Sequence, residues 1–113
     1  MNNKVKKEVE EIIKIDEFNC SVEEFKYKVN WHSLSRFKKI SEDFIREFEY
    51  EVVWVYISRV QKLSEEFIYE FQDKLDIDCL IKDNKITKNR LLELTYLDPA
   101  IPKYSRFEIL DIR

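Results

Sequence analysis

Residues 54–71 read WVYISRVQKLSEEFIYEF, and residues 31–48 read WHSLSRFKKISEDFIREF. The two stretches are copies of one unit, since Trp54 follows Trp31 by 54 − 31 = 23 positions. Over the full blocks 31–53 and 54–76, ten of the 23 positions hold identical residues. Ordinary amino-acid usage would give about one or two identities by chance. Self-similarity at such a period is typical of repeat architectures, in which one unit cannot bury its apolar face alone.

Each repeat is predicted to form two short helices. The first begins near Asn30 or Asp76, which are good N-cap residues, and carries the tryptophan position. The second begins at Ser41, Ser64 or Thr87, and acidic residues in its first turn suit the helix dipole. Its buried stripe recurs at the same spacing in both full copies, as Phe44, Ile45, Phe48 and Val52 and then as Phe67, Ile68, Phe71 and Leu75.

The repeats are predicted to be flanked by a leading helix and a different kind of tail. Val5, Val9 and Ile12 fall on one face of a helix over about residues 3–15. A partial copy begins at Ser21, which has capping-box spacing to Glu24. A third copy, from residue 77, decays as expected of a terminal repeat. The tail contains both prolines and an alternating segment, so a short strand, irregular chain or one more short helix is expected there.

The predicted fold is therefore all-α, a short α-solenoid of stacked helical hairpins with a small β or irregular C-terminal tail. We expect one domain over residues 1–113, divided into a leading helix and connector (1–20), helical repeats (21–97) and a tail (98–113). The chain contains no glycine, so glycine hairpins and glycine-rich phosphate loops are excluded.

The repeated unit resembles a short helical repeat with the pattern W-x-x-I-S-x-x-Q-x-L-S-E-E-F-I-x-E-F. Repeats of this kind are associated with phages, large DNA viruses and AT-rich bacterial genomes. The likeness covers about residues 21–94, with Leu34 in place of Ile and Lys38 in place of Gln in the first full copy. It implies a stacked helical scaffold and neither an enzyme activity nor catalytic residues.

The charge and the apolar content of the chain argue against several classes of function. The net charge is −3, from 20 basic and 23 acidic side chains, and no basic stripe of the kind that nucleic-acid binders show is visible. The longest apolar stretch, residues 52–57, is too short to span a bilayer, and the N-terminus lacks an apolar signal core. We therefore expect no membrane association and a cytoplasmic location, in the host cell if the protein is phage-encoded. Cys20 and Cys79 lack metal-ligand spacing and are expected to be free thiols.

No set of residues predicts catalysis, a metal or a cofactor. His32 is the only histidine, and no partner that would orient it as a general base can be assigned. The repeated acidic residues are explained by their places in the first turn and on the outer face of a helix. The protein is accordingly predicted not to be an enzyme.

The most informative surface positions are those at which the copies differ. Such positions are free of the core, so they are available to a partner. The residues predicted to bind a partner protein are His32, Val55, Tyr56, Arg59, Tyr50 and Tyr69. The expected function is non-catalytic protein binding, in a concrete form as a phage or mobile-element inhibitor of a bacterial defence protein, for example an anti-CRISPR. The alternative is nucleic-acid binding or regulation through the basic residues of the last third, Lys82, Lys85, Lys88, Arg90, Lys103 and Arg106.

Overall fold

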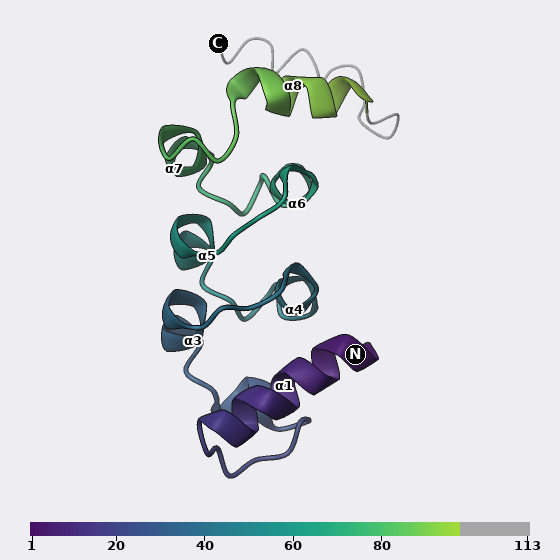
Figure 1. Ribbon diagram of the computed structural model, residues 1–113, viewed down its shortest axis with the longest axis vertical. Coiled ribbons are helices and arrows are strands. Elements are labelled where there is room, and N and C mark those ends of the chain that lie inside the picture. Colours follow the sequence, from purple (N-terminus) through teal and green to yellow (C-terminus); the bar gives the residue numbers. More distant parts are fainter. Residues whose placement is uncertain (98–113) are drawn as a thin grey trace. The chain divides into compact units, whose positions relative to one another are not determined.

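The computed structural model describes residues 1–97, and within that range it is all-α, with eight helices and no strand (Figure 1). The predicted tail, 98–113, lies outside the described residues. The helices are α1 (Asn3–Ile15), α2 (Phe25–Lys28), α3 (Trp31–Phe37), α4 (Glu42–Glu47), α5 (Trp54–Val60), α6 (Glu65–Glu70), α7 (Ile77–Lys82) and α8 (Lys88–Leu97). The prediction of an all-α fold is confirmed.

Contacts divide the chain into two compact units, Met1–Gln61 and Lys62–Arg113. Such a boundary is expected in a repeat array, because each repeat contacts only its neighbours. The predicted single domain and the stacking of hairpins along the whole chain stay predictions. Within the first unit, however, α3 and α5 occupy equivalent places in successive repeats and pack against each other.

Side-chain caps set the starts of most of the helices, as the sequence predicts. Asn30 accepts a hydrogen bond from the amide of Ser33 (3.1 Å), and Asp76 accepts one from Cys79 (3.1 Å). The second-helix caps behave alike, with bonds from Phe44 to Ser41, from Phe67 to Ser64 and from Arg90 to Thr87 of 3.1, 3.2 and 3.0 Å. The amides at a helix start have no partner within the helix, so these bonds decide where each helix begins.

The predicted capping box at Ser21 forms, but the helix after it is short. Ser21 Oγ accepts from the Glu24 amide (3.2 Å), and Glu24 Oε1 accepts from the Ser21 amide (3.1 Å). Glu24 Oε1 also accepts from the Ser21 hydroxyl (3.1 Å), and the bonds from the Ser21 amide and then from its hydroxyl hold the pKa of Glu24 below its ordinary value. The α-helix itself spans only Phe25–Lys28 and ends at Val29, just before the Asn30 cap of α3.

The first unit is built around four aromatic rings. Phe25, Trp31, Phe44 and Phe48 contact one another in all six pairings, with ring centroids 4.8–6.3 Å apart. Phe25 and Phe44 are fully buried. Tilted and edge-on contacts of this kind stabilise a core beyond the area that they bury. Residues from α2, α3 and α4 thus share one core.

The leading helix α1 covers this unit from the side of α4. Val5, Val9 and Ile12, predicted to form its apolar face, are buried. Glu8 accepts hydrogen bonds from the amide and the hydroxyl of Ser41, at 2.9 and 2.6 Å, so α1 also binds the start of α4 through a carboxylate.

The two tryptophans are less buried than their place in the repeat predicts. Both are half-buried, and each indole turns its N–H toward a backbone carbonyl five positions earlier. Trp31 Nε1 donates to the carbonyl of Lys26, and Trp54 Nε1 donates to that of Glu49, both at 2.9 Å. An indole N–H withdrawn from water needs such a partner.

In the second unit, α6 packs against α8. Phe67 and Ile68 are fully buried, and the Phe67 and Phe71 rings lie 4.6 Å apart. Arg90 replaces the repeat phenylalanine at the start of α8 and pairs with Glu65 (3.1 Å) and Glu93 (3.0 Å). Its hydrogen bonds to Glu93 and Glu65 raise the pKa of Arg90 above its ordinary value.

Gln61, at the end of the first unit, ties α5 to the loop that follows α3. Its side chain is buried, with 4% of its surface exposed. Nε2 donates to the carbonyls of Ser35 (3.0 Å) and Lys38 (2.7 Å), and Oε1 accepts from the amide of Ile40 (3.3 Å). One amide side chain thereby satisfies three backbone groups of the preceding repeat, which would otherwise be costly to bury.

Candidate protein-binding surface

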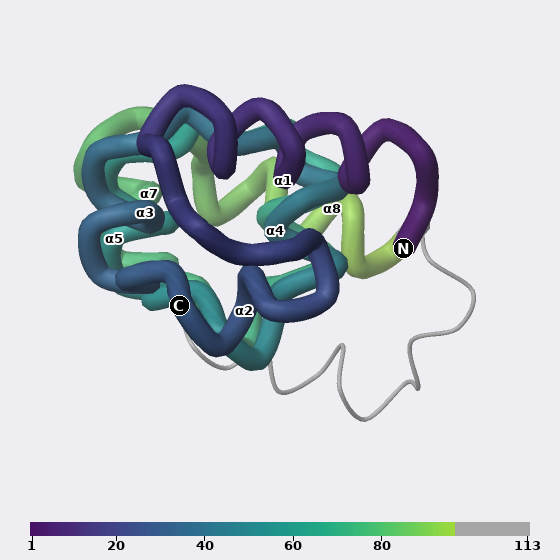
Figure 2. The backbone as a smooth tube through the Cα atoms, turned by 90° about the horizontal axis from the view of Figure 1, so that it is seen from below, coloured from purple at the N-terminus to yellow at the C-terminus, as the bar shows by residue number. Residues whose placement is uncertain are grey.

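The packing of α3 against α5 creates an exposed surface on the first unit. In both views α3 and α5 lie on the same side of this unit, away from α4 (Figure 1, Figure 2). Ser35 joins the two elements from within, because its fully buried Oγ accepts a hydrogen bond from the amide of Val53 (3.0 Å), the residue before α5. The outward residues of the pair are His32, Arg36, Phe37, Val55, Tyr56, Arg59 and Val60, and we call them the α3–α5 face.

Tyr56 organises this face by contacting two residues of the preceding repeat. Its ring meets the His32 ring edge-on, with centroids 6.0 Å apart and planes at 74°. The Arg36 guanidinium carbon lies 5.6 Å from the centroid of Tyr56 and 5.0 Å from that of Phe37. These distances fall within the range of cation–π attraction, so Arg36 is held between two aromatic rings. Tyr56 is half-buried as a result, and not fully exposed as the sequence predicts.

Three large apolar side chains of α3 and α5 are exposed to solvent. Phe37 is 72% exposed, Val60 51% and Val55 41%. Single exposed apolar residues are normal on a protein surface, and these three add apolar area to the outer sides of α3 and α5. Tyrosine, phenylalanine and arginine are enriched at protein interfaces, and Tyr56, Phe37 and Arg36 supply these residue types here.

The α3–α5 face carries positive charge only. Neither α3, with the sequence WHSLSRF, nor α5, with the sequence WVYISRV, contains an Asp or Glu residue. Each contributes one arginine at the same repeat position, Arg36 and Arg59, and both side chains are exposed. Acidic residues of the first unit instead occur on α1 and α4.

Four of the six predicted partner-binding residues meet on this face, namely His32, Val55, Tyr56 and Arg59. The other two lie elsewhere. Tyr50 is 84% exposed in the turn after α4, and Tyr69 belongs to α6 of the second unit and is half-buried. The prediction missed Arg36 and Phe37. The signal for Arg36 was present, since Arg36 and Arg59 are identical in the two copies although neither belongs to the core pattern.

A small hollow adjoins the face at Phe37. Its volume is about 110 Å³, and its lining comes from the connector, the end of the first partial repeat and α3: Asp16, Phe18, Val29, Asn30, Ser33, Leu34, Phe37 and Lys38. Lys38 and Asp16 form an ion pair of 2.7 Å there. Most of the remaining lining is apolar, so the hollow is suited to an apolar side chain more than to a charged one.

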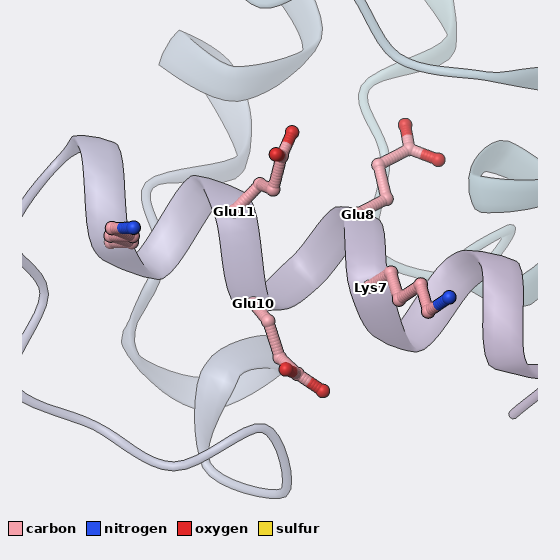
Figure 3. Close-up of a pocket in the computed structure, with 5 residues that line it drawn as sticks. Lys7, Glu8, Glu10 and Glu11 are labelled. Carbon is pink, nitrogen blue, oxygen red and sulfur yellow. The ribbon is translucent and has the colours of Figure 1, made fainter.

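A second depression lies on the outside of α1 and is lined by Lys7, Glu8, Glu10, Glu11 and Lys14. Figure 3 shows Glu8 and Glu11 pointing to one side of the helix and Glu10 to the other. All five residues come from one helix, and Glu8 is engaged by Ser41, so the carboxylates do not converge on a common point. The depression lacks the converging groups of a binding pocket.

Within residues 1–97, no group of three or more His, Cys, Asp and Glu side chains could hold a metal ion. Neither Cys20 nor Cys79 forms a disulfide, both are half-buried, and the Cys79 thiol donates a hydrogen bond to Asp83 Oδ2 at 3.5 Å. In the same part of the chain, no helix has the length and apolar character required to cross a bilayer.

Comparison with protein-family models, with curated proteins and with solved structures gives no significant match.

Proposed function

We propose that the protein is a non-catalytic binding protein whose α3–α5 face binds another protein. The observation that carries this proposal is the arrangement around Tyr56, which lies against His32 and Arg36. Because these contacts already fix the tyrosine ring, it would lose little side-chain freedom on binding. Pre-positioned tyrosine and arginine residues surrounded by apolar side chains are typical binding hot spots.

The more specific form of the proposal is an inhibitor, made by a phage or mobile element, that occludes a bacterial defence protein such as a CRISPR effector in the host cytoplasm. The support for it is the likeness of the repeat to those of phages and large DNA viruses, together with the small size of the chain. An interference assay in bacteria that carry an active CRISPR system tests it. Restored plasmid or phage survival on expression of the protein would support the inhibitor, and unchanged interference with a range of systems would contradict it.

The binding proposal is tested by substituting one tyrosine on the face and one away from it. Crosslinking capture from a bacterial lysate identifies the partner, which is then titrated against purified variants. Tyr56→Ala should weaken binding by about 2 kcal/mol or more, as expected of a hot spot. Its loss of folding stability, from one ring contact and one cation–π contact, should be about 1–2 kcal/mol in a melting experiment.

Tyr50→Ala is the matched control, because Tyr50 is exposed in a turn outside the α3–α5 face. It should change neither the melting temperature nor the affinity appreciably. If Tyr50→Ala abolished binding while Tyr56→Ala preserved it, the binding surface would lie at the turn after α4 and the proposal would be wrong.

The structure gives less support to the alternative, which is nucleic-acid binding through the basic residues of the last third of the chain. Arg90 is engaged by two carboxylates, and two of the other five basic residues, Lys103 and Arg106, lie outside the described residues. Affinity for an oligonucleotide that falls steeply with added salt would favour this alternative.

A further inference from the structure

The hollow beside Phe37 indicates the size of one group that the α3–α5 face accepts. A dry cavity of about 150 Å³ lined by apolar side chains is large enough for benzene. The hollow here measures about 110 Å³ and is lined mainly by apolar atoms of Phe18, Val29, Leu34 and Phe37. It therefore fits one aliphatic side chain, such as Leu, Ile or Val, and is small for a nucleobase.

The charge next to the hollow indicates the second group. Phe37 lines the hollow, and the Arg36 guanidinium lies 5.0 Å from the Phe37 ring centroid. Among the residues that the structure describes, Arg36 makes ring contacts but has no carboxylate within ion-pair distance. Lys38 differs, because Asp16 already neutralises it. Arg36 is thus a cation held against two aromatic rings, one of which, Phe37, also lines the hollow.

We infer that the α3–α5 face binds a short acidic segment of a partner protein, with an aliphatic side chain in the hollow and an adjacent carboxylate on Arg36. This inference rests on the proposed function and specifies its partner. A guanidinium suits a carboxylate because it donates two parallel hydrogen bonds. Since α3 and α5 lack acidic residues, nothing on either helix repels such a segment.

Nucleic acid fits these features less well. Single-strand binders combine stacking aromatics with a long basic groove. Here the basic residues of the face are few, the net charge of the chain is −3, and α1 and α4 of the same unit carry carboxylates. The aliphatic size of the hollow also favours a peptide side chain.

The test uses the full-length protein and a display library of random 12-residue peptides, followed by anisotropy titration of the most enriched peptide. We expect enrichment of peptides in which Asp or Glu stands within three residues of Leu, Ile or Val. Arg36→Gln should weaken binding of the enriched peptide at least about 10-fold, in line with loss of a charge-assisted hydrogen bond. Arg36→Lys should recover part of that loss, and Phe37→Ala should also weaken binding.

Arg46→Gln is the matched control, since Arg46 is a half-buried arginine of α4 outside the face and pairs with Asp43 at 3.1 Å. It should alter affinity less than about 2-fold. Ellipticity melts of every variant separate lost folding from lost binding. Enriched peptides without acidic residues, or equal binding by Arg36→Gln and the unsubstituted protein, would overturn the inference.

Two further outcomes separate this inference from the proposed function. If no peptide is enriched while a captured protein still binds in a manner that depends on Tyr56, the acidic-segment inference is wrong and the proposed function stands. If the oligonucleotide dT12 displaces the enriched peptide at equal or lower concentration, the face recognises a polyanion, and the inference of a peptide partner is overturned.

Discussion

At the scale of the residue, the tryptophans of the repeat combine core packing with a fixed hydrogen bond. Trp31 contacts three phenylalanine rings, yet its indole nitrogen reaches the Lys26 carbonyl. Trp54 makes the equivalent bond to Glu49. The indole therefore fixes the chain that enters each first helix, a role that no purely apolar side chain at this position could perform.

Replacing each tryptophan with phenylalanine should isolate that bond. Trp31→Phe and Trp54→Phe keep an aromatic ring and remove the N–H donor. Each should lower the free energy of unfolding by about 1–2 kcal/mol, from the lost hydrogen bond and the smaller ring. Urea titration followed by ellipticity measures both. A difference of more than about 1 kcal/mol between the two variants would show that the copies are not energetically equivalent at this position.

At the scale of the element, Gln61 joins successive repeats. A helix that ends in a short loop leaves carbonyls and amides without partners. In the loop after α3, the side chain of Gln61 supplies partners for the carbonyls of Ser35 and Lys38 and for the amide of Ile40. The packing of α3 against α5 is thus stabilised by hydrogen bonds between repeats as well as by apolar contacts.

Gln61→Ala should therefore lower the free energy of unfolding by more than most substitutions of a polar side chain. It leaves three backbone groups of a buried loop to find water, and we expect a loss of about 2–4 kcal/mol in urea denaturation. Gln72→Ala provides the comparison, because half-buried Gln72 donates only to the nearby carbonyl of Tyr69 among the bonds described. That variant should lose less than about 1 kcal/mol. Equal losses would mean that the amide of Gln61 adds little beyond its volume.

At the scale of the whole molecule, the contacts concentrate within two units. The stability of a repeat protein is approximately a sum over repeats and neighbouring interfaces, so parts of one chain can respond differently to a substitution. Both tryptophans of the sequence belong to the first unit, which makes their fluorescence a local probe, whereas ellipticity reports helices of both units.

A matched pair of substitutions tests this division. Phe44 and Phe67 are equivalent, fully buried residues of the first and second units. Phe67→Ala should lower the denaturation midpoint followed by ellipticity more than the midpoint followed by tryptophan fluorescence. Phe44→Ala should lower the fluorescence midpoint at least as much, and each variant should lose about 3–5 kcal/mol in its own unit. Coincident midpoints for both probes in both variants would instead show one cooperative transition.

Much of the fold was predictable because local polar residues mark the helix starts. Asn30, Ser41 and Ser64 act as N-caps where their residue types and spacing predict. The burial of Trp31 and Trp54 was overestimated, because an apolar pattern does not reveal where an indole N–H will find a carbonyl. The short α2 was also not foreseen, since its length is set by the cap of the next helix.

The candidate site was predictable only in part. Repeat spacing alone places His32 and Tyr56 on neighbouring helices, and positions that vary between copies point outward. Arg36 was overlooked although its equivalent in the next copy, Arg59, was predicted to bind a partner, because the contact of Arg36 with Tyr56 joins two repeats. The hollow at Phe37 could not be foreseen, because Asp16 and Phe18 of the non-repeated connector form part of it.

The hydrogen bonds of Gln61 also bear on how such a chain can change length during evolution. Its partners belong to the repeat immediately before it, and the packing of α3 on α5 is likewise between neighbours. An in-frame duplication of residues 54–76 would therefore bring its own copy of Gln61, whereas a duplication of residues 31–53 would bring Lys38 at the equivalent position. An insertion of any other length would move the glutamine away from the carbonyls that it serves. Genes for proteins of this type should gain and lose length in whole repeats, and each gain would add a new outer surface on which selection can act.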